Sequence, residues 1–148
     1  VFEGTPEKGG VMIVALVGAV PEEVESVIGV VMDERAKVQR FSVSHRPLNA
    51  RAFALRSALE RDRFNADWLT IVPVSHPEEV ATIRAIGGRV AHLYSMCAHP
   101  SILIAPGDLM VAVPGGRRGA HVVQAADLYS QLRSITLASR ERPAKKRA

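Results

Sequence analysis

The chain has 148 residues, of which 47% are hydrophobic and 23% are charged, and its formal net charge is +4. This size and composition fit one globular domain with a full core. No apolar run approaches the roughly 20 residues that a membrane-spanning helix needs. The first ten residues also lack the pattern of a secretory signal, and a single cysteine excludes an internal disulfide. We therefore expect an intracellular protein without a membrane segment.

The positive charge is concentrated at the C-terminal end. Residues 140–148 contain five basic side chains and Glu141, so the rest of the chain is formally neutral. We interpret residues 139–148 as a basic tail that either contacts a polyanion such as nucleic acid or remains in solvent. The candidate polyanion contacts are Arg140, Arg142, Lys145, Lys146 and Arg147.

The N-terminal part of the sequence predicts an arm, a strand and a helix. Residues 1–10 combine three glycines, a proline and alternating charge, which favours an extended arm. The apolar run from Val11 to Val17 is typical of a central parallel strand buried on both faces. Gly18, Ala19 and Val20 then turn the chain into Pro21, after which apolar residues recur at helical spacing.

Between Lys37 and Pro47 the pattern fits a strand and an irregular crossing equally well. A helical stripe then begins near Asn49, and the arginines that lie off this stripe are typical of a solvated cationic face. The stripe consists of Leu48, Ala52, Leu55 and Leu59.

The stretch from Asp67 to Ser95 predicts a strand, a helix and a second strand. Trp68 to Val74 is rich in β-forming residues, and a capping candidate, a proline and two acids follow in the order of a helix start. Gly87 and Gly88 provide a left-handed helix exit, and Val90 to Tyr94 is again apolar. Such a βαβ unit makes its strands parallel and predicts a ligand crevice at their carboxyl ends.

The remaining chain completes the predicted domain. Ser95 to Pro106 has the composition of a loop or a short helix, and Leu109 to Val113 is typical of another buried strand. Apolar spacing predicts a final helix from about Ala120 to Ala138. Over residues 11–138 the sequence thus predicts a three-layer α/β domain, with a mostly parallel sheet and helices on both faces.

The first strand-turn-helix unit is where a phosphate-binding loop would be expected. Such a loop has the sequence G-x-x-x-x-G-K-[ST], which surrounds phosphate with backbone N–H groups and a lysine. Counted from Gly18, the positions for glycine, lysine and hydroxyl hold Glu23, Val24 and Glu25. Glu22 adds a further negative charge at the helix start, so the loop is absent and phosphate is disfavoured there.

Other candidate sites depend on isolated residues. Cys97 and His99 have His92 and His121 elsewhere in the sequence, but a loop or core role is favoured over a metal site, and no metal or cofactor is predicted. His76 is placed either for a ligand contact at a strand end or simply at a helix start. Nothing resembles a nucleophile elbow, because Gly-x-Ser-x-Gly does not occur.

The unit that follows the strand predicted at Trp68 to Val74 carries a family pattern. Its residues Pro77, Glu79, Ile83-Arg84-Ala85 and Gly87-Gly88 match a motif in which D-V-R-F-P-N-E is followed by a helix ending in A-I-R-A-L-G-G. This motif and the order of the elements resemble the deoxynucleoside monophosphate kinases of bacteriophages, a branch of the P-loop kinase fold. The likeness covers most of residues 11–136, including the strand that begins at Asp108-Leu109.

The same comparison identifies what is missing. The aspartate and the arginine of the family motif are replaced by Pro73 and Ser75, and the phosphate-binding lysine and hydroxyl are absent. The resemblance therefore implies a P-loop kinase-like fold without kinase activity, a pseudokinase. It implies a structural or interaction role with protein partners or in self-assembly, either in the cytoplasm or in a phage virion or capsid.

Two alternatives remain open at the level of the sequence. The first is a regulator that binds a nucleotide or nucleoside without turnover, through Gly18, Ala19, Val20, Pro21, His76, Arg117 and Arg118. The paired arginines follow the last strand, where they either bind an anion or solvate a loop. The second alternative is an active nucleoside monophosphate kinase whose phosphate-binding cations are relocated, for example to Arg46 or Arg51.

Overall fold

The computed structural model describes residues 12–35, 37–60, 68–95, 99–116, 119 and 121–147, with side chains of the last helix described up to residue 138. Several predicted features lie outside these residues. They are the N-terminal arm at residues 1–10, Cys97, Arg117 and Arg118, and the side chains of the basic tail.

One six-stranded sheet forms the centre of the molecule. Its strand order is β2-β3-β1-β4-β5-β6, and every neighbouring pair is parallel. The prediction of a mostly parallel sheet is confirmed. The strands are β1 (Ile13–Val17), β2 (Val38–Arg40), β3 (Leu69–Val74), β4 (Arg89–Tyr94), β5 (Leu109–Ala112) and β6 (Val122–Val123).

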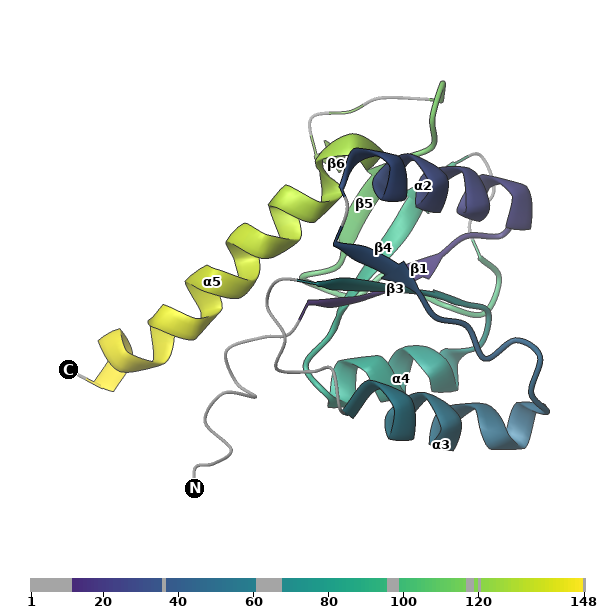
Figure 1. Cartoon of the computed structure of the whole chain (residues 1–148), viewed down its shortest axis with the longest axis horizontal. Coiled ribbons are helices and arrows are strands. Elements are labelled where there is room, and N and C mark those ends of the chain that lie inside the picture. Colours follow the sequence, from purple (N-terminus) through teal and green to yellow (C-terminus); the bar gives the residue numbers. More distant parts are fainter. Residues whose placement is uncertain are drawn as a thin grey trace.

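Helices cover both faces of the sheet, as predicted (Figure 1). One face packs against α2 (Pro21–Glu34) and the start of α5 (Leu128–Arg147), and the other packs against α3 (Leu48–Leu59) and α4 (Pro77–Ala85). The central strand β1 is buried throughout, and its side chains alternate between the two cores. This alternation is the period of a strand that is covered on both sides.

The prediction of a final helix from about Ala120 is wrong in its first part. Val122 and Val123 form β6 beside β5, Ala125–Asp127 is a 3₁₀ turn, and α5 begins only at Leu128. The apolar residues looked like the stripe of a single helix because Ala125, in the turn, packs into the same core as Leu128 and Leu132, in the helix. At its other end α5 extends beyond Ala138 to Arg147 and includes most of the predicted basic tail.

Two segments that the sequence left open are resolved by the structure. Between Lys37 and Pro47 a three-residue strand, β2, is followed by irregular chain. Residues 102–105 have no regular secondary structure, so a loop and not a short helix follows β4 there.

Within the described ranges, no helix is long and apolar enough to span a bilayer.

The order of the strands predicts a crevice at the carboxyl ends of β1 and β3. Because β3 lies between β1 and β2, the order differs from the doubly wound arrangements 3-2-1-4-5-6 and 2-1-3-4-5. The chain leaves β1 through α2 over one face and leaves the adjacent β3 through α4 over the other. Where neighbouring connections diverge in this way, the carboxyl ends of the two strands border a cleft.

Candidate functional site

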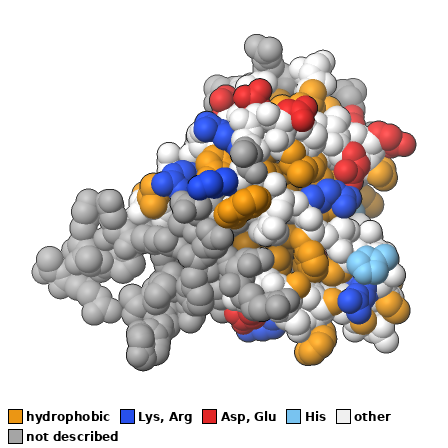
Figure 2. All heavy atoms as spheres, in the orientation of Figure 1, with side chains coloured by type: hydrophobic (Ala, Val, Ile, Leu, Met, Phe, Trp, Pro, Cys, Tyr) orange, Lys and Arg blue, Asp and Glu red, His pale blue; other side chains and the backbone are white. Residues whose placement is uncertain are grey.

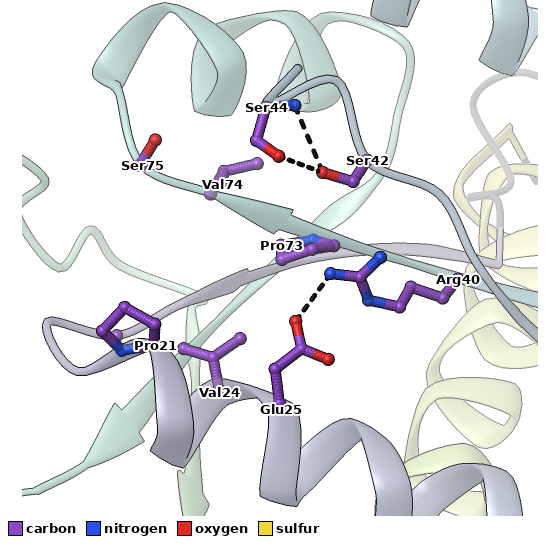
Figure 3. Close-up of a pocket in the computed structure, with 10 residues that line it drawn as sticks. Pro21, Val24, Glu25, Arg40, Ser42, Ser44, Pro73, Val74 and Ser75 are labelled. Atoms are coloured by element: carbon purple, nitrogen blue, oxygen red, sulfur yellow. Dashed lines mark hydrogen bonds and ion pairs between the residues drawn. The ribbon is translucent and has the colours of Figure 1, made fainter.

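A cavity of about 180 Å³ occupies this crevice (Figure 3). Its walls come from three places: the turn from β1 into α2, the chain after β2, and the end of β3. The lining residues are Gly18, Pro21, Val24, Glu25, Arg40, Ser42, Ser44, Pro73, Val74 and Ser75. The sequence-based expectation of a cleft at the carboxyl ends of the strands thus corresponds to a hollow in the structure.

The charges at this cavity are already paired. Arg40 is the one basic side chain among the lining residues, and its Nη2 lies 2.6 Å from Oε2 of Glu25 (Figure 3). Both side chains are partly exposed, at 39% and 53%, so the pair adds little to stability. Binding an anion here would require Arg40 to leave a carboxylate that lines the same cavity.

The first turn of α2 offers few donors to a phosphate. Pro21 has no backbone N–H, and the N–H of Glu23 donates to the carbonyl of Val20 at 3.1 Å. A helix start binds phosphate through the free N–H groups of its first turn. In this helix the proline and the internal hydrogen bond leave fewer of those groups for a phosphate.

Carboxylates occupy the same end of the helix. Oε1 of Glu23 accepts a hydrogen bond of 2.9 Å from the hydroxyl of Ser95, which follows β4, and Glu22 is exposed. Acidic side chains are visible over this helix at the upper right of Figure 2. They complement the positive end of the helix dipole, which is the role that a bound phosphate would otherwise have.

The predicted nucleotide-binding residues are only partly brought together. Gly18 and Pro21 line the cavity, whereas Ala19 and Val20 belong to the same turn without lining it. His76 immediately precedes α4, and its backbone N–H donates to Oε1 of Glu79 at 3.3 Å. It is not among the residues that line this cavity.

Gly18 is required by packing. A Cβ at this position would lie 2.6 Å from Cδ1 of Leu93 and 2.8 Å from Cγ2 of Val24. The glycine therefore lets α2 approach β4 closely, and its presence needs no phosphate to explain it.

Arg51 forms an internal bridge. Its guanidinium donates to the carbonyls of Arg46 and Ser44 at 2.9 and 2.8 Å, and its Nη1 lies 3.5 Å from Oε2 of Glu79. The carboxylate of Glu79 is buried and also accepts the backbone N–H of Ser75 at 2.8 Å. This network ties the chain after β2 to the start of α4.

A second cavity, of about 230 Å³, lies beside the first, at the carboxyl ends of β1 and β4. Val17, Gly18, His92, Leu93, Tyr94, Ser95, His99, Ile102, Ile104 and Met110 line it. No aspartate, glutamate, lysine or arginine is among these residues. The cavity is therefore apolar with a few neutral polar groups, which is the usual character of a small-molecule site.

Next to this cavity lies a polar cluster around a buried carboxylate, and sequence reasoning missed it. The carboxylate of Asp108, 2% exposed, accepts two hydrogen bonds from Arg84 at 2.8 and 2.9 Å. It also contacts Nε2 of His92 at 2.8 Å and accepts the N–H of Ala105 at 2.9 Å. Arg84 and His92 lie 24 and 16 residues from Asp108 in the sequence, so no local motif indicated that they meet.

The cluster keeps Asp108 ionised. Burial alone would raise the pKa of this carboxyl, but the hydrogen bonds from Arg84, Ala105 and His92 outweigh burial and lower the pKa below its ordinary value of 3.8. The hydrogen bond to Asp108 in turn raises the pKa of Arg84. An ionised carboxylate accepts, so Nε2 of His92 carries the proton that faces it.

The described part of the chain contains no evident metal site. Among those residues, no group of three or more His, Cys, Asp or Glu side chains is placed to hold an ion. His92 instead contacts Asp108, and His121 stacks edge-on against Tyr94 at 5.6 Å between ring centroids.

Fold and site together define a three-layer α/β protein with an all-parallel sheet and two cavities at the carboxyl ends of its strands. The chain matches no family model, and comparisons with curated proteins and with solved structures likewise give no match.

Proposed function

We propose that this protein is a non-catalytic α/β module of P-loop kinase-like ancestry whose role is structural or in protein interaction. The observation that carries the proposal is the start of α2, where a kinase would hold phosphate. It has a proline without an N–H, the N–H of Glu23 bonded to the carbonyl of Val20, and the carboxylates of Glu22 and Glu23. Phosphoryl transfer depends on positioning the phosphate and neutralising its charge. The missing N–H cannot position a phosphate, and the carboxylates repel it.

The interaction role is supported by apolar side chains on α3. Phe53 is 78% exposed and Leu48 is 53% exposed, although each is large and apolar. Orange side chains project at the lower edge of Figure 2, in the region of α3. Exposed aromatic side chains of this size are common at contacts between proteins. A phage particle as the setting rests on the sequence resemblance alone.

A second candidate function is nucleotide or nucleoside binding without turnover. It is favoured by the cavity at the carboxyl ends of β1 and β3, the place where α/β sheets usually bind ligands. An active kinase with relocated cations has less support. Arg51, one of the proposed cations, is engaged with Ser44, Arg46 and Glu79.

The test is a thermal-unfolding scan of the purified chain with ATP, dATP and deoxynucleoside monophosphates plus magnesium, beside its mass in solution. A ligand at 100 times its dissociation constant adds about 2.7 kcal/mol to folding stability, which shifts the midpoint visibly. We expect no shift and a mass above one chain or a stable partner complex. A clear, saturable shift would replace the proposal with the nucleotide-binding alternative.

Two variants locate the contact. Phe53→Ser should lower the mass of the assembly towards that of one chain, because it removes an exposed aromatic side chain from α3. Leu103→Ser is the matched control, since Leu103 is 80% exposed but belongs to the loop after β4. An unchanged mass for the Phe53 variant would exclude α3 as the contact.

A further inference from the structure

The second cavity contains a buried hydrogen-bonding group that has no partner among the residues the structure describes. His92 is 5% exposed and lines the cavity. Its Nε2 is engaged with Asp108, and no other hydrogen bond joins it to any residue the structure describes. In the neutral ring the remaining nitrogen, Nδ1, is therefore an acceptor that no described residue satisfies. A buried polar group in this state requires a ligand or water to avoid a penalty of about 1–3 kcal/mol.

A donor is available in the same cavity. Nδ1 of His99 accepts the backbone N–H of Ser101 at 3.1 Å. The proton of the neutral His99 ring is consequently on Nε2. His92 and His99 both line the cavity, so it offers one acceptor and one donor.

The walls limit the size and charge of an occupant. Val17, Ile102, Ile104 and Met110 are apolar, and none of the described residues that line the space is an aspartate, glutamate, lysine or arginine. A charged ligand would lose its hydration without gaining an opposite charge. An apolar cavity of about 150 Å³ is known to accommodate benzene, so about 230 Å³ is enough for one six-membered ring with polar substituents.

We propose that this cavity binds a small uncharged ring that carries adjacent N–H and C=O groups, a cyclic amide. The ligand N–H donates to Nδ1 of His92, and its carbonyl accepts from Nε2 of His99. Asp108 and Arg84 act behind the site by holding the His92 ring in the tautomer that accepts. This proposal is independent of the function proposed above, because it uses neither the α2 start nor α3.

The probe is 2-pyridone, with 1-methyl-2-pyridone as the matched ligand that lacks the N–H. Long-range ¹H–¹⁵N spectra of the histidine rings should show a saturable shift of the His92 Nδ1 resonance with 2-pyridone. The methylated compound should bind at least roughly tenfold more weakly, since it leaves the buried acceptor unpaired. A thermal-unfolding scan with both compounds gives the same comparison without resonance assignment.

Two variants test the location. Ile104 is 59% exposed and lines the cavity, so Ile104→Trp should fill its mouth and abolish binding while the chain stays folded. Leu103→Trp changes the adjacent exposed residue, which does not line the cavity, and should bind as the wild type does. The proposal is overturned if 2-pyridone produces no saturable shift, if the methylated compound binds equally well, or if Ile104→Trp leaves binding unchanged.

Discussion

At the scale of single residues, Asp108 is the ionised group on which the contact between α4, β4 and β5 depends. Arg84 from α4, His92 from β4 and the backbone of Ala105 all converge on its carboxylate. We expect Asp108→Asn to lower the free energy of unfolding at neutral pH by about 1–3 kcal/mol, because it leaves buried His92 and partly exposed Arg84 without their anion.

The same residue predicts an acid dependence. Its pKa is lower in the folded protein than in the unfolded chain, so its stabilising contribution is complete above the ordinary value of 3.8 and is lost as the pH falls through the lower folded value. Denaturant unfolding between pH 7 and pH 2 should show a smaller acid loss in Asp108→Asn than in the wild type. Asp33→Asn, at an exposed position in α2, should retain the wild-type slope. An identical slope in both variants would contradict this role of Asp108.

Two glycines give a third residue-scale prediction. At Gly88 a Cβ would lie 2.6 Å from Cγ2 of Ile83 and 3.0 Å from the carbonyl oxygen of Ile13, so Gly88→Ala should cost about 1–3 kcal/mol. At Gly29, inside α2, nothing lies within 4 Å of the added carbon. Gly29→Ala should therefore raise stability by up to about 1 kcal/mol. Chemical denaturation compares the two, and a loss at both sites would mean that α2 packs differently.

At the scale of the elements, Arg51 and Arg56 both lie on α3 but differ in their contacts and burial. Arg51 joins two carbonyls and buried Glu79, whereas Arg56 lies 3.8 Å from Glu60 with both side chains exposed to solvent. Arg51→Met should lower the free energy of unfolding by about 3 kcal/mol, and Arg56→Met by less than about 0.5 kcal/mol. Urea titration measures both. Equal effects would show that the Arg51 bridge contributes no more than a surface pair.

Most elements were predictable because each had enough residues to show its period. The apolar run of β1, the proline and acids that begin α2 and α4, and the glycine exit at Gly87 all correspond to observed boundaries. The two-residue β6 was missed because so short a strand has no period of its own.

The location of the site was predictable from the sequence, but the contacts of its side chains were not. Alternating strands and helices indicated a crevice at the carboxyl ends of the strands, and a cavity lies there. The contact of Asp108 with His92 depends on the register between β4 and β5, in which Ala91 is paired with Leu109. No local pattern in the sequence specifies that register.

At the scale of the whole molecule, stability should be graded across the sheet from its centre to its edge. β1 is fully buried and has β3 and β4 as neighbours, whereas β6 is an edge strand with only partly buried residues. Native-state hydrogen exchange should show the amides of β1 opening only with global unfolding and those of β6 opening far more readily. Equal protection in β1 and β6 would contradict this gradient.

The central place of β1 also determines when the sheet can be completed during synthesis. Val14 is paired with Ile71 on one side and with Arg89 on the other, and both partners emerge from the ribosome long after it. At translation rates of about 5–20 residues per second, β1 waits on the order of 10 s before both neighbours exist. During that time its apolar surface has no permanent cover, so the nascent chain should depend on chaperones more than its small size suggests.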